Sequence, residues 1–138
     1  MYKIDLEYED FTGETVQETL YFNLTKTEAM ALASKEDGKY VDILKNIAEM
    51  GNPQRILEVF TELVLSSYGV RSEDGRRFMK NDTLREEFRC SAAFDELMSR
   101  LITDKDTSVE FINAIIPTKG INDMLEKMKE NTKEISND

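Results

Sequence analysis

Apolar and polar positions alternate at the start of the chain. From Tyr2 to Tyr8 every second side chain is apolar, which is the period of a strand with one buried face. A less regular alternation runs from Thr15 to Phe22, and Asp10–Gly13 between the two has the composition of a turn. The pattern predicts an N-terminal β-hairpin that packs on the rest of the protein, because a lone hairpin is marginal in water. Its outer edge could accept a strand from another chain, which is a route to self-association.

After this hairpin the apolar positions follow a helical period, and caps and breakers divide them into separate helices. Thr25 and Glu28 have the spacing of a capping box that opens a short helix. A second helix is predicted near Tyr40, and Asn52 and Pro53 offer a cap and a first-turn proline for a third. We expect the third to be the central core helix, because its face is the most apolar. That face consists of Ile56, Leu57, Phe60, Leu63, Val64 and Tyr68.

The stretch from Tyr68 to Lys80 separates this helix from those that follow. Gly69 is predicted to end the helix in the left-handed conformation that glycine adopts readily. Ser72–Gly75 contains an Asp-Gly pair, which suits a tight reversal of the backbone. We therefore expect a hairpin-like turn over residues 69–78, and then a new helix for which residues 81–83 offer caps.

Further helices are predicted after this turn. The apolar positions from Leu84 to Ile102 keep a helical spacing, which Arg89–Ser91 interrupts to give two helices. Thr107 and Glu110 have the spacing of a second capping box, and Pro117 ends the helix that this box opens. The predicted fold class is α+β and mainly α, with the N-terminal β-hairpin packed on a bundle of about five or six short helices.

The last two helical stretches are candidates for contact with a partner protein. The helix from Thr107 is apolar around more of its circumference than a surface helix needs, which is explained either by burial in the core or by a face that binds a partner. Methionines in the weaker stripe from Ile121 to Met128 are explained either as core filler or as an adaptable binding surface. The candidate partner-binding residues are Phe111, Ile112, Ile115, Ile116, Met124 and Met128.

The length and the drift in composition predict one domain with a tail. A chain of 138 residues can bury one core without disulfides or metals. Residues 129–138 are almost entirely polar or charged. We expect a single globular domain over residues 1–128 and a flexible acidic and polar tail over residues 129–138.

Charge restricts the class of partner. The formal net charge is -10, with 28 acidic and 18 basic residues, which argues against binding to nucleic acid or to an anionic membrane surface. A basic or neutral protein partner is more natural. The sequence has neither the pattern of a signal peptide nor a run of apolar residues long enough for a membrane span, so we expect a cytoplasmic protein.

The residues that usually carry catalysis are scarce. The chain has no histidine, which removes the commonest general base and metal ligand. Its single cysteine, Cys90, falls within a helical pattern and is expected to be a buried, inert thiol. No glycine motif has the spacing that cradles a phosphate. We therefore expect no enzymatic activity, no cofactor and no metal site.

Three segments carry a family resemblance: Tyr21–Lys26, Tyr68–Phe78 and Phe111–Pro117. In this order they resemble the tail assembly chaperones of long-tailed bacteriophages, particularly phages of Gram-positive hosts. The resemblance implies a non-enzymatic factor that acts in the host cell cytoplasm and is absent from the mature virion. It also implies two partners, the tape measure protein, which the chaperone binds and solubilises, and the tail tube protein, which it helps to recruit.

Two other functions stay open at this point. The net charge of -10 is compatible with an acidic nucleic-acid mimic that inhibits a host DNA-binding enzyme, although basic residues are interspersed among the acidic ones throughout. A minor structural protein of the virion is the second alternative, and its presence in purified particles would distinguish it from a chaperone.

Overall fold

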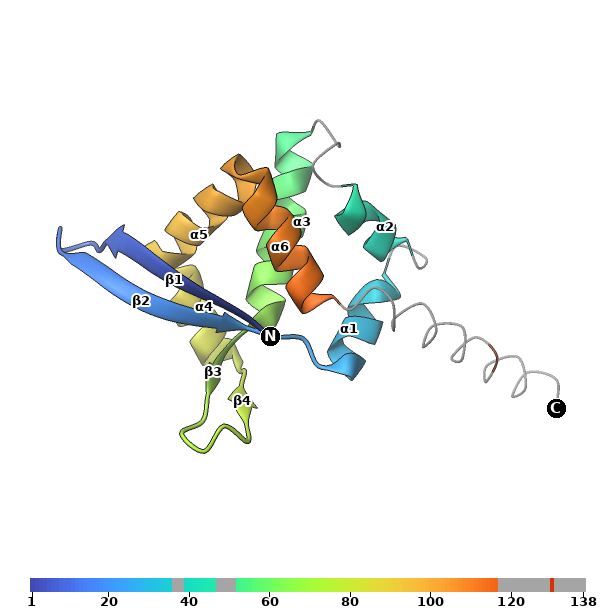
Figure 1. The fold of residues 1–138 in the computed structure, drawn as a ribbon, viewed down its shortest axis with the longest axis horizontal. Coiled ribbons are helices and arrows are strands. Elements are labelled where there is room, and N and C mark those ends of the chain that lie inside the picture. Colours follow the sequence, from blue (N-terminus) through green and yellow to red (C-terminus); the bar gives the residue numbers. More distant parts are fainter. Residues whose placement is uncertain (36–38, 47–51, 117–129, 131–138) are drawn as a thin grey trace.

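Helices and one antiparallel sheet make up the fold of the computed structural model, which describes residues 1–35, 39–46, 52–116 and 130. The order of strands in the sheet is β1-β2-β3-β4. Two hairpins, β1–β2 and β3–β4, project from the helical part in different directions (Figure 1). The described elements are, in chain order, β1 (Tyr2–Glu9), β2 (Thr15–Phe22), α1 (Lys26–Ala33), α2 (Tyr40–Lys45), α3 (Pro53–Ser67), β3 (Tyr68–Arg71), β4 (Phe78–Met79), α4 (Asp82–Arg89), α5 (Ala92–Thr103) and α6 (Lys105–Ile115).

The N-terminal hairpin forms as its alternation predicts. Strands β1 and β2 pair in register at eight positions, from Tyr2 opposite Phe22 to Glu9 opposite Thr15. The turn between them contains Gly13 in the left-handed region, at φ 85°. The expected class, α+β and mainly α with a hairpin packed on helices, is confirmed, and the sheet also includes the hairpin-like segment at 69–78.

An aromatic cluster joins the sheet to the helices. The Phe22 ring is fully buried, and its centroid lies 5.5 Å from that of Phe111 on α6 and 5.9 Å from that of Phe88 on α4. Phe88 also stacks on Tyr68, with the rings 4.0 Å apart and nearly parallel. Tyr2 of β1 makes an edge contact with Phe111 at 5.1 Å. Rings from β1, β2, α4 and α6 therefore meet in one core, where aromatic pairs add to the hydrophobic free energy.

Helix α3 is the central core helix, as its apolar face predicts. It buries Val59, Phe60, Leu63, Val64 and Ser67. Asn52 caps its first turn by accepting hydrogen bonds from two backbone N–H groups, and Pro53 occupies the first helical position. The prediction fails at Leu57, which is 46% exposed.

The chain turns between helices where polar caps allow it. The Thr25 and Glu28 capping box is present at the start of α1. Asn81 caps α4, and Ser91 caps α5 immediately after the break that the sequence predicts. Helix α6 begins earlier than expected, because the carboxylate of Asp104 accepts from the backbone N–H groups of the first turn. The predicted second capping box was therefore wrong.

Gly69 does not end α3 in the left-handed conformation that we predicted. The helix ends at Ser67, and Tyr68 already has extended backbone angles that lead directly into β3. Among the described residues the only glycines with positive φ are Gly13 and Gly75. Gly69 is needed for space instead, because a Cβ there would lie 2.5 Å from the ring of Phe78.

Candidate partner-binding surfaces

The apolar side chains of α6 that were candidates for partner contact lie in the core. Phe111 is fully buried, and Ile112, Ile115 and Ile116 are 6% exposed or less. Burial, the first of the two explanations for this helix, accounts for all four side chains. In this conformation they can reach a partner only if α6 moves away from the sheet, so their role in binding stays a prediction. Met124 and Met128 lie outside the described residues.

The part of the chain that the structure describes bears on the expectations about metal ligands and Cys90. It contains no group of three or more metal-ligating side chains. No helix in the described ranges is long and apolar enough to cross a membrane. Cys90 is exposed rather than buried, which corrects our expectation. It caps the C-terminus of α4, where the chain leaves the helix and the side chain turns outward.

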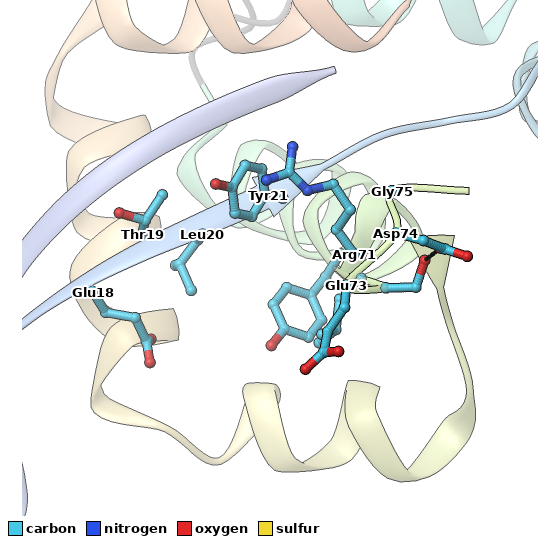
Figure 2. Close-up of a pocket in the computed structure, with 12 residues that line it drawn as sticks. Glu18, Thr19, Leu20, Tyr21, Arg71, Glu73, Asp74 and Gly75 are labelled. Atoms are coloured by element: carbon cyan, nitrogen blue, oxygen red, sulfur yellow. Dashed lines mark hydrogen bonds between the residues drawn. The ribbon is translucent and has the colours of Figure 1, made fainter. Parts of the chain in front are cut away.

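A wedge-shaped opening separates β2 from β3. The two strands pair only at Phe22 opposite Tyr68 and at Tyr21 opposite Gly69. Beyond these pairs β3 diverges, and a hollow lies between Glu18–Tyr21 on one side and Tyr68–Gly75 on the other (Figure 2). Among the described residues, no strand pairs with the remainder of β2 along this edge.

The hydrogen-bond pattern identifies the backbone groups that face the wedge. In an antiparallel ladder, alternate residues direct both backbone groups to the same neighbour. The Asn23 N–H donates to the carbonyl of Ser67 at 2.8 Å, which places the odd-numbered positions of β2 toward β3. The Asp10 N–H donates to the carbonyl of Glu14 at 2.8 Å, which places the even-numbered positions toward β1. The groups that face the opening without a strand partner are therefore those of Thr15, Gln17 and Thr19.

Charged side chains surround this opening. The carboxylates of Glu18 and Glu73 point to the same side of the two strands (Figure 2), and neither has an ion pair in the described part of the chain. Burial, and then the nearby Glu18 and Glu87, raise the pKa of Tyr68. Arg71 also lines the opening, where its guanidinium lies 4.9 Å from the centre of the Tyr21 ring. Three carboxylates and one cationic side chain line the wedge, which is therefore acidic on balance.

The second hairpin presents apolar side chains beside the wedge. Val70 of β3 lies directly opposite Met79 of β4, so both project from the same face of the hairpin. They are 43% and 44% exposed, respectively. At the far end of the first hairpin, Phe11 is 85% exposed. Exposed apolar side chains on both projecting hairpins are candidates for contact with a partner.

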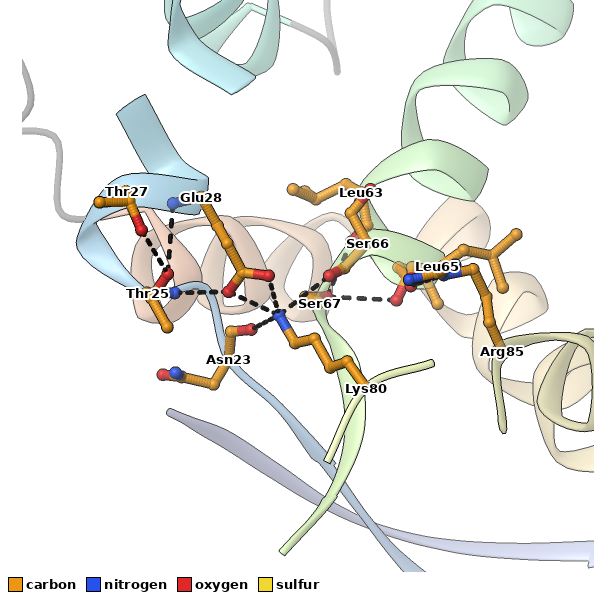
Figure 3. A network of polar contacts seen from close by, with 11 residues as sticks. Asn23, Thr25, Thr27, Glu28, Leu63, Leu65, Ser66, Ser67, Lys80 and Arg85 are labelled. Atoms are coloured by element: carbon orange, nitrogen blue, oxygen red, sulfur yellow. Dashed lines mark hydrogen bonds and ion pairs between the residues drawn. The ribbon is translucent and has the colours of Figure 1, made fainter. Parts of the chain in front are cut away.

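Lys80 fixes the base of the second hairpin to the helices (Figure 3). Its side chain is 13% exposed, and its Nζ donates to the carbonyl of Asn23 at 2.6 Å and to that of Ser66 at 3.0 Å. It also contacts both carboxylate oxygens of Glu28, at 2.8 and 3.0 Å. Because Ser66 lies in the last turn of α3, the ammonium group satisfies a helix carbonyl and complements the helix dipole.

Glu28 has two structural roles at this site. Its Oε1 accepts from the backbone N–H of Thr25 at 2.9 Å, and the same carboxylate forms the ion pair with Lys80. Partial burial opposes ionisation of Glu28, but the hydrogen bonds from Lys80 and Thr25 outweigh it and hold its pKa below the usual range. One carboxylate thus joins the cap of α1 to the end of α3 and the base of the second hairpin.

Neither the wedge nor the Lys80 contact follows from local pattern. The wedge depends on where β3 leaves β2, and Lys80 meets Glu28 across 52 positions of sequence. In the sequence Lys80 is a cation at the end of the turn segment of an acidic chain. Its place at the end of the turn segment did not indicate a role.

Comparison with known proteins identifies the family. A family model described as phage tail assembly chaperone matches residues 1–138. No curated protein and no solved structure matches the chain. A tail assembly chaperone is an assembly factor and not an enzyme, in agreement with the expectation from the sequence. Because the match covers the whole sequence given, the chain belongs to the phage tail assembly chaperone family.

Proposed function

We propose that this chain binds and solubilises the tape measure protein and helps to recruit the tail tube protein while the tail is built. The observation that carries this proposal is the family match over residues 1–138. Chaperones of phage tail assembly act on tail proteins, and the tape measure protein is the tail component most in need of a cover, since it is long, helical and prone to aggregation. The proposed site of action is the host cell cytoplasm, and the mature virion is proposed to lack the chain.

The surface of the chain supports this role. A net charge of -10 favours solubility of a complex that contains many copies. Exposed apolar side chains on the two hairpins offer contacts to the apolar faces of a long helix. Leu57 on α3 and Ile102 on α5 add exposed apolar positions on the helices, at 46% and 44% exposed, respectively.

Co-expression tests the proposal. The tape measure protein of the same phage is produced with and without this chain, and its soluble fraction is measured after affinity purification. We expect it to be insoluble alone, and soluble and associated with several copies of the chain when both are produced. A tape measure protein that stays insoluble and unbound, while this chain folds normally, would contradict the proposal.

The composition of purified virions separates a chaperone from a minor structural protein. Quantitative mass spectrometry of particles should detect the tape measure and tail tube proteins and should not detect this chain. A fixed number of copies in every particle would indicate a structural protein instead.

Variants test whether the exposed apolar side chains of the second hairpin contact the tape measure protein. Replacing Val70 and Met79 with serine changes exposed side chains, so the fold should persist while binding of the tape measure protein weakens. The matched control is Val109→Ser on α6, at similar exposure on another element. Equal binding by all variants would remove the second hairpin from the proposed surface.

A further inference from the structure

The edge of β2 that faces the wedge lacks most of the features that protect sheet edges. Exposed edges are normally blocked by proline, charged side chains (lysine above all), a bulge or a covering element, because free backbone groups pair readily with another strand. Thr15–Thr19 contains neither proline nor lysine, its one charged side chain is Glu18, and its register with β1 continues without a bulge. Threonine and valine in this segment favour extended backbone. The edge is therefore competent to accept a further strand.

The geometry fixes where such a strand would lie. Pairing between β2 and β3 closes the wedge at Tyr21 and Gly69, so an added strand can run along β2 only as far as Thr19. At about 3.3 Å per residue, the open edge accommodates an extended segment of about five residues. Its backbone would bond to the free groups of Thr15, Gln17 and Thr19, while its side chains alternate between the two faces of the sheet.

The carboxylates beside the wedge determine which kind of segment can bind along β2. On one face an incoming side chain next to Glu18 meets a carboxylate without an ion pair, and Glu73, beyond the end of β3 on the other side of the opening, offers another. A lysine or arginine at these positions gains cross-strand attraction, whereas an acidic segment is repelled. A second copy of this chain, with its net charge of -10, is a poor occupant for the same reason.

We propose that the edge Thr15–Thr19 of β2 binds an extended segment of a tail protein that is rich in lysine or arginine, by strand addition into the wedge beside β3. The inference rests on the proposed function in one respect, namely that the partner is a tail protein. This inference goes beyond the proposed function because it names the surface, the backbone atoms and the chemistry of the bound segment.

Overlapping peptides that tile the tape measure and tail tube proteins of the same phage provide the probe. The full chain is applied to the array, and the bound peptides are then titrated in solution. We expect the bound peptides to be basic and to bind at low salt more tightly than at high salt. Binding confined to neutral or acidic peptides, or no peptide bound, overturns the inference.

Substitutions at Gln17 test the backbone contact. Its N–H faces the wedge and not β1, so Gln17→Pro removes an edge donor without breaking the β1–β2 ladder. We expect about a tenfold loss of peptide affinity, which is the effect of one hydrogen bond. The control Gln17→Ala removes the same side chain but keeps the N–H, and should bind as the unmodified chain does. Equal affinities for the two variants overturn the inference.

Charge and amide exchange give two readouts that do not depend on how well the proline variant folds. Glu18→Gln with Glu73→Gln should weaken binding about tenfold, whereas Glu110→Gln on α6 should not. By NMR, the amides of Gln17 and Thr19 should exchange fast in the free chain and slowly with peptide bound, while those of Glu18 and Leu20 stay slow throughout. Unchanged exchange at Gln17 and Thr19 overturns the inference.

Failure here and failure of the proposed function give different results. If the Gln17→Pro chain still solubilises the co-expressed tape measure protein as well as the Gln17→Ala chain does, and no peptide protects the β2 amides, the chaperone role stands and this site is wrong. If the unmodified chain solubilises nothing but still binds basic peptides at β2, the site stands and the proposed solubilisation of the tape measure protein is wrong.

Discussion

The two hairpins of the sheet are held in place in different ways. β1 and β2 pair at eight positions, and backbone bonds between neighbouring segments define the hairpin. β3 and β4 pair at only two positions, too few to hold a hairpin in water. The second hairpin depends instead on side-chain contacts at its base, where Phe78 covers Gly69 and Lys80 reaches Asn23, Glu28 and Ser66. The short strands β3 and β4 are therefore positioned by a few side-chain contacts rather than by a long ladder of backbone hydrogen bonds.

Removing the contacts of Lys80 should loosen the second hairpin relative to the first more than any of the changes that follow. Lys80→Met keeps the aliphatic stem but leaves Glu28 and two backbone carbonyls without their cation. We expect the free energy of unfolding to fall by about 2–3 kcal/mol, as measured by urea denaturation. Amide exchange should increase in β3 and β4 and change little in β1.

The control for this variant is Lys35→Met. Lys35 also forms an ion pair, with Glu62, but both side chains are more than a third exposed. An exposed pair contributes little, so we expect a change within about 0.5 kcal/mol. Equal losses for the two lysine variants would show that Lys80 has no special structural role.

Crowding at Gly69 should have the next largest effect. A Cβ there would lie 2.5 Å from the Phe78 ring and 2.9 Å from the backbone carbonyl oxygen of Met79. Gly69→Ala must displace both, at a cost of about 1–3 kcal/mol by thermal or urea unfolding. In a Phe78→Ala background the same change should cost less, because one of the two obstacles is gone.

Gly75→Ala distinguishes crowding from backbone strain. Gly75 has φ 73°, and a Cβ at this position would have no neighbouring atom within 4 Å, so alanine meets strain but no obstacle. We expect a loss of about 1 kcal/mol that is independent of Phe78. A cost of Gly69→Ala that is likewise unaffected by Phe78→Ala would contradict the packing explanation.

Acid should loosen the second hairpin before the first, and this is the smallest expected effect. The pKa of Glu28 is held below its ordinary value of 4.5, so the folded state favours the ionised carboxylate. Its contribution is complete above the ordinary value and is lost as the pH falls through the lowered pKa. The protection factors of the amides in β3 and β4, which correct for the slower intrinsic exchange in acid, should therefore fall below about pH 4.5 in the unmodified chain. In Lys80→Met this pH dependence should be weaker, and an unchanged pH profile would contradict the role assigned to the ion pair.

Local sequence pattern predicts most of the strands and helix starts, but it predicts much less of how they are arranged in space. Alternation predicted β2 over its observed residues and β1 to within one residue of its end, and the caps predicted at Thr25, at Asn52 and within residues 81–83 marked true helix starts. These signals succeed because each depends on neighbours within a few positions. The prediction at Gly69 failed because the role of this residue depends on a position outside that range. Gly69 makes room for Phe78, nine positions later, and no local pattern carries that information.

The candidate site was harder to predict than the fold. The apolar face of α6 looked available for a partner because the sequence does not show that Tyr2 and Phe22 cover Phe111. The open edge of β2 could not be predicted because it exists only where β3 departs from its neighbour. Burial and strand pairing are properties of tertiary contacts, so the surfaces that remain free become apparent only in the folded chain.

A phage that lacks this chain shows whether tail assembly depends on it. A nonsense mutation in its gene, in a non-suppressing host, should leave DNA-filled heads without tails by electron microscopy, with the tape measure protein in the insoluble fraction. Supplying the unmodified chain or Lys35→Met from a plasmid should restore tailed particles that do not contain it. Tails of normal number and length without the chain, and a soluble tape measure protein, would contradict the account.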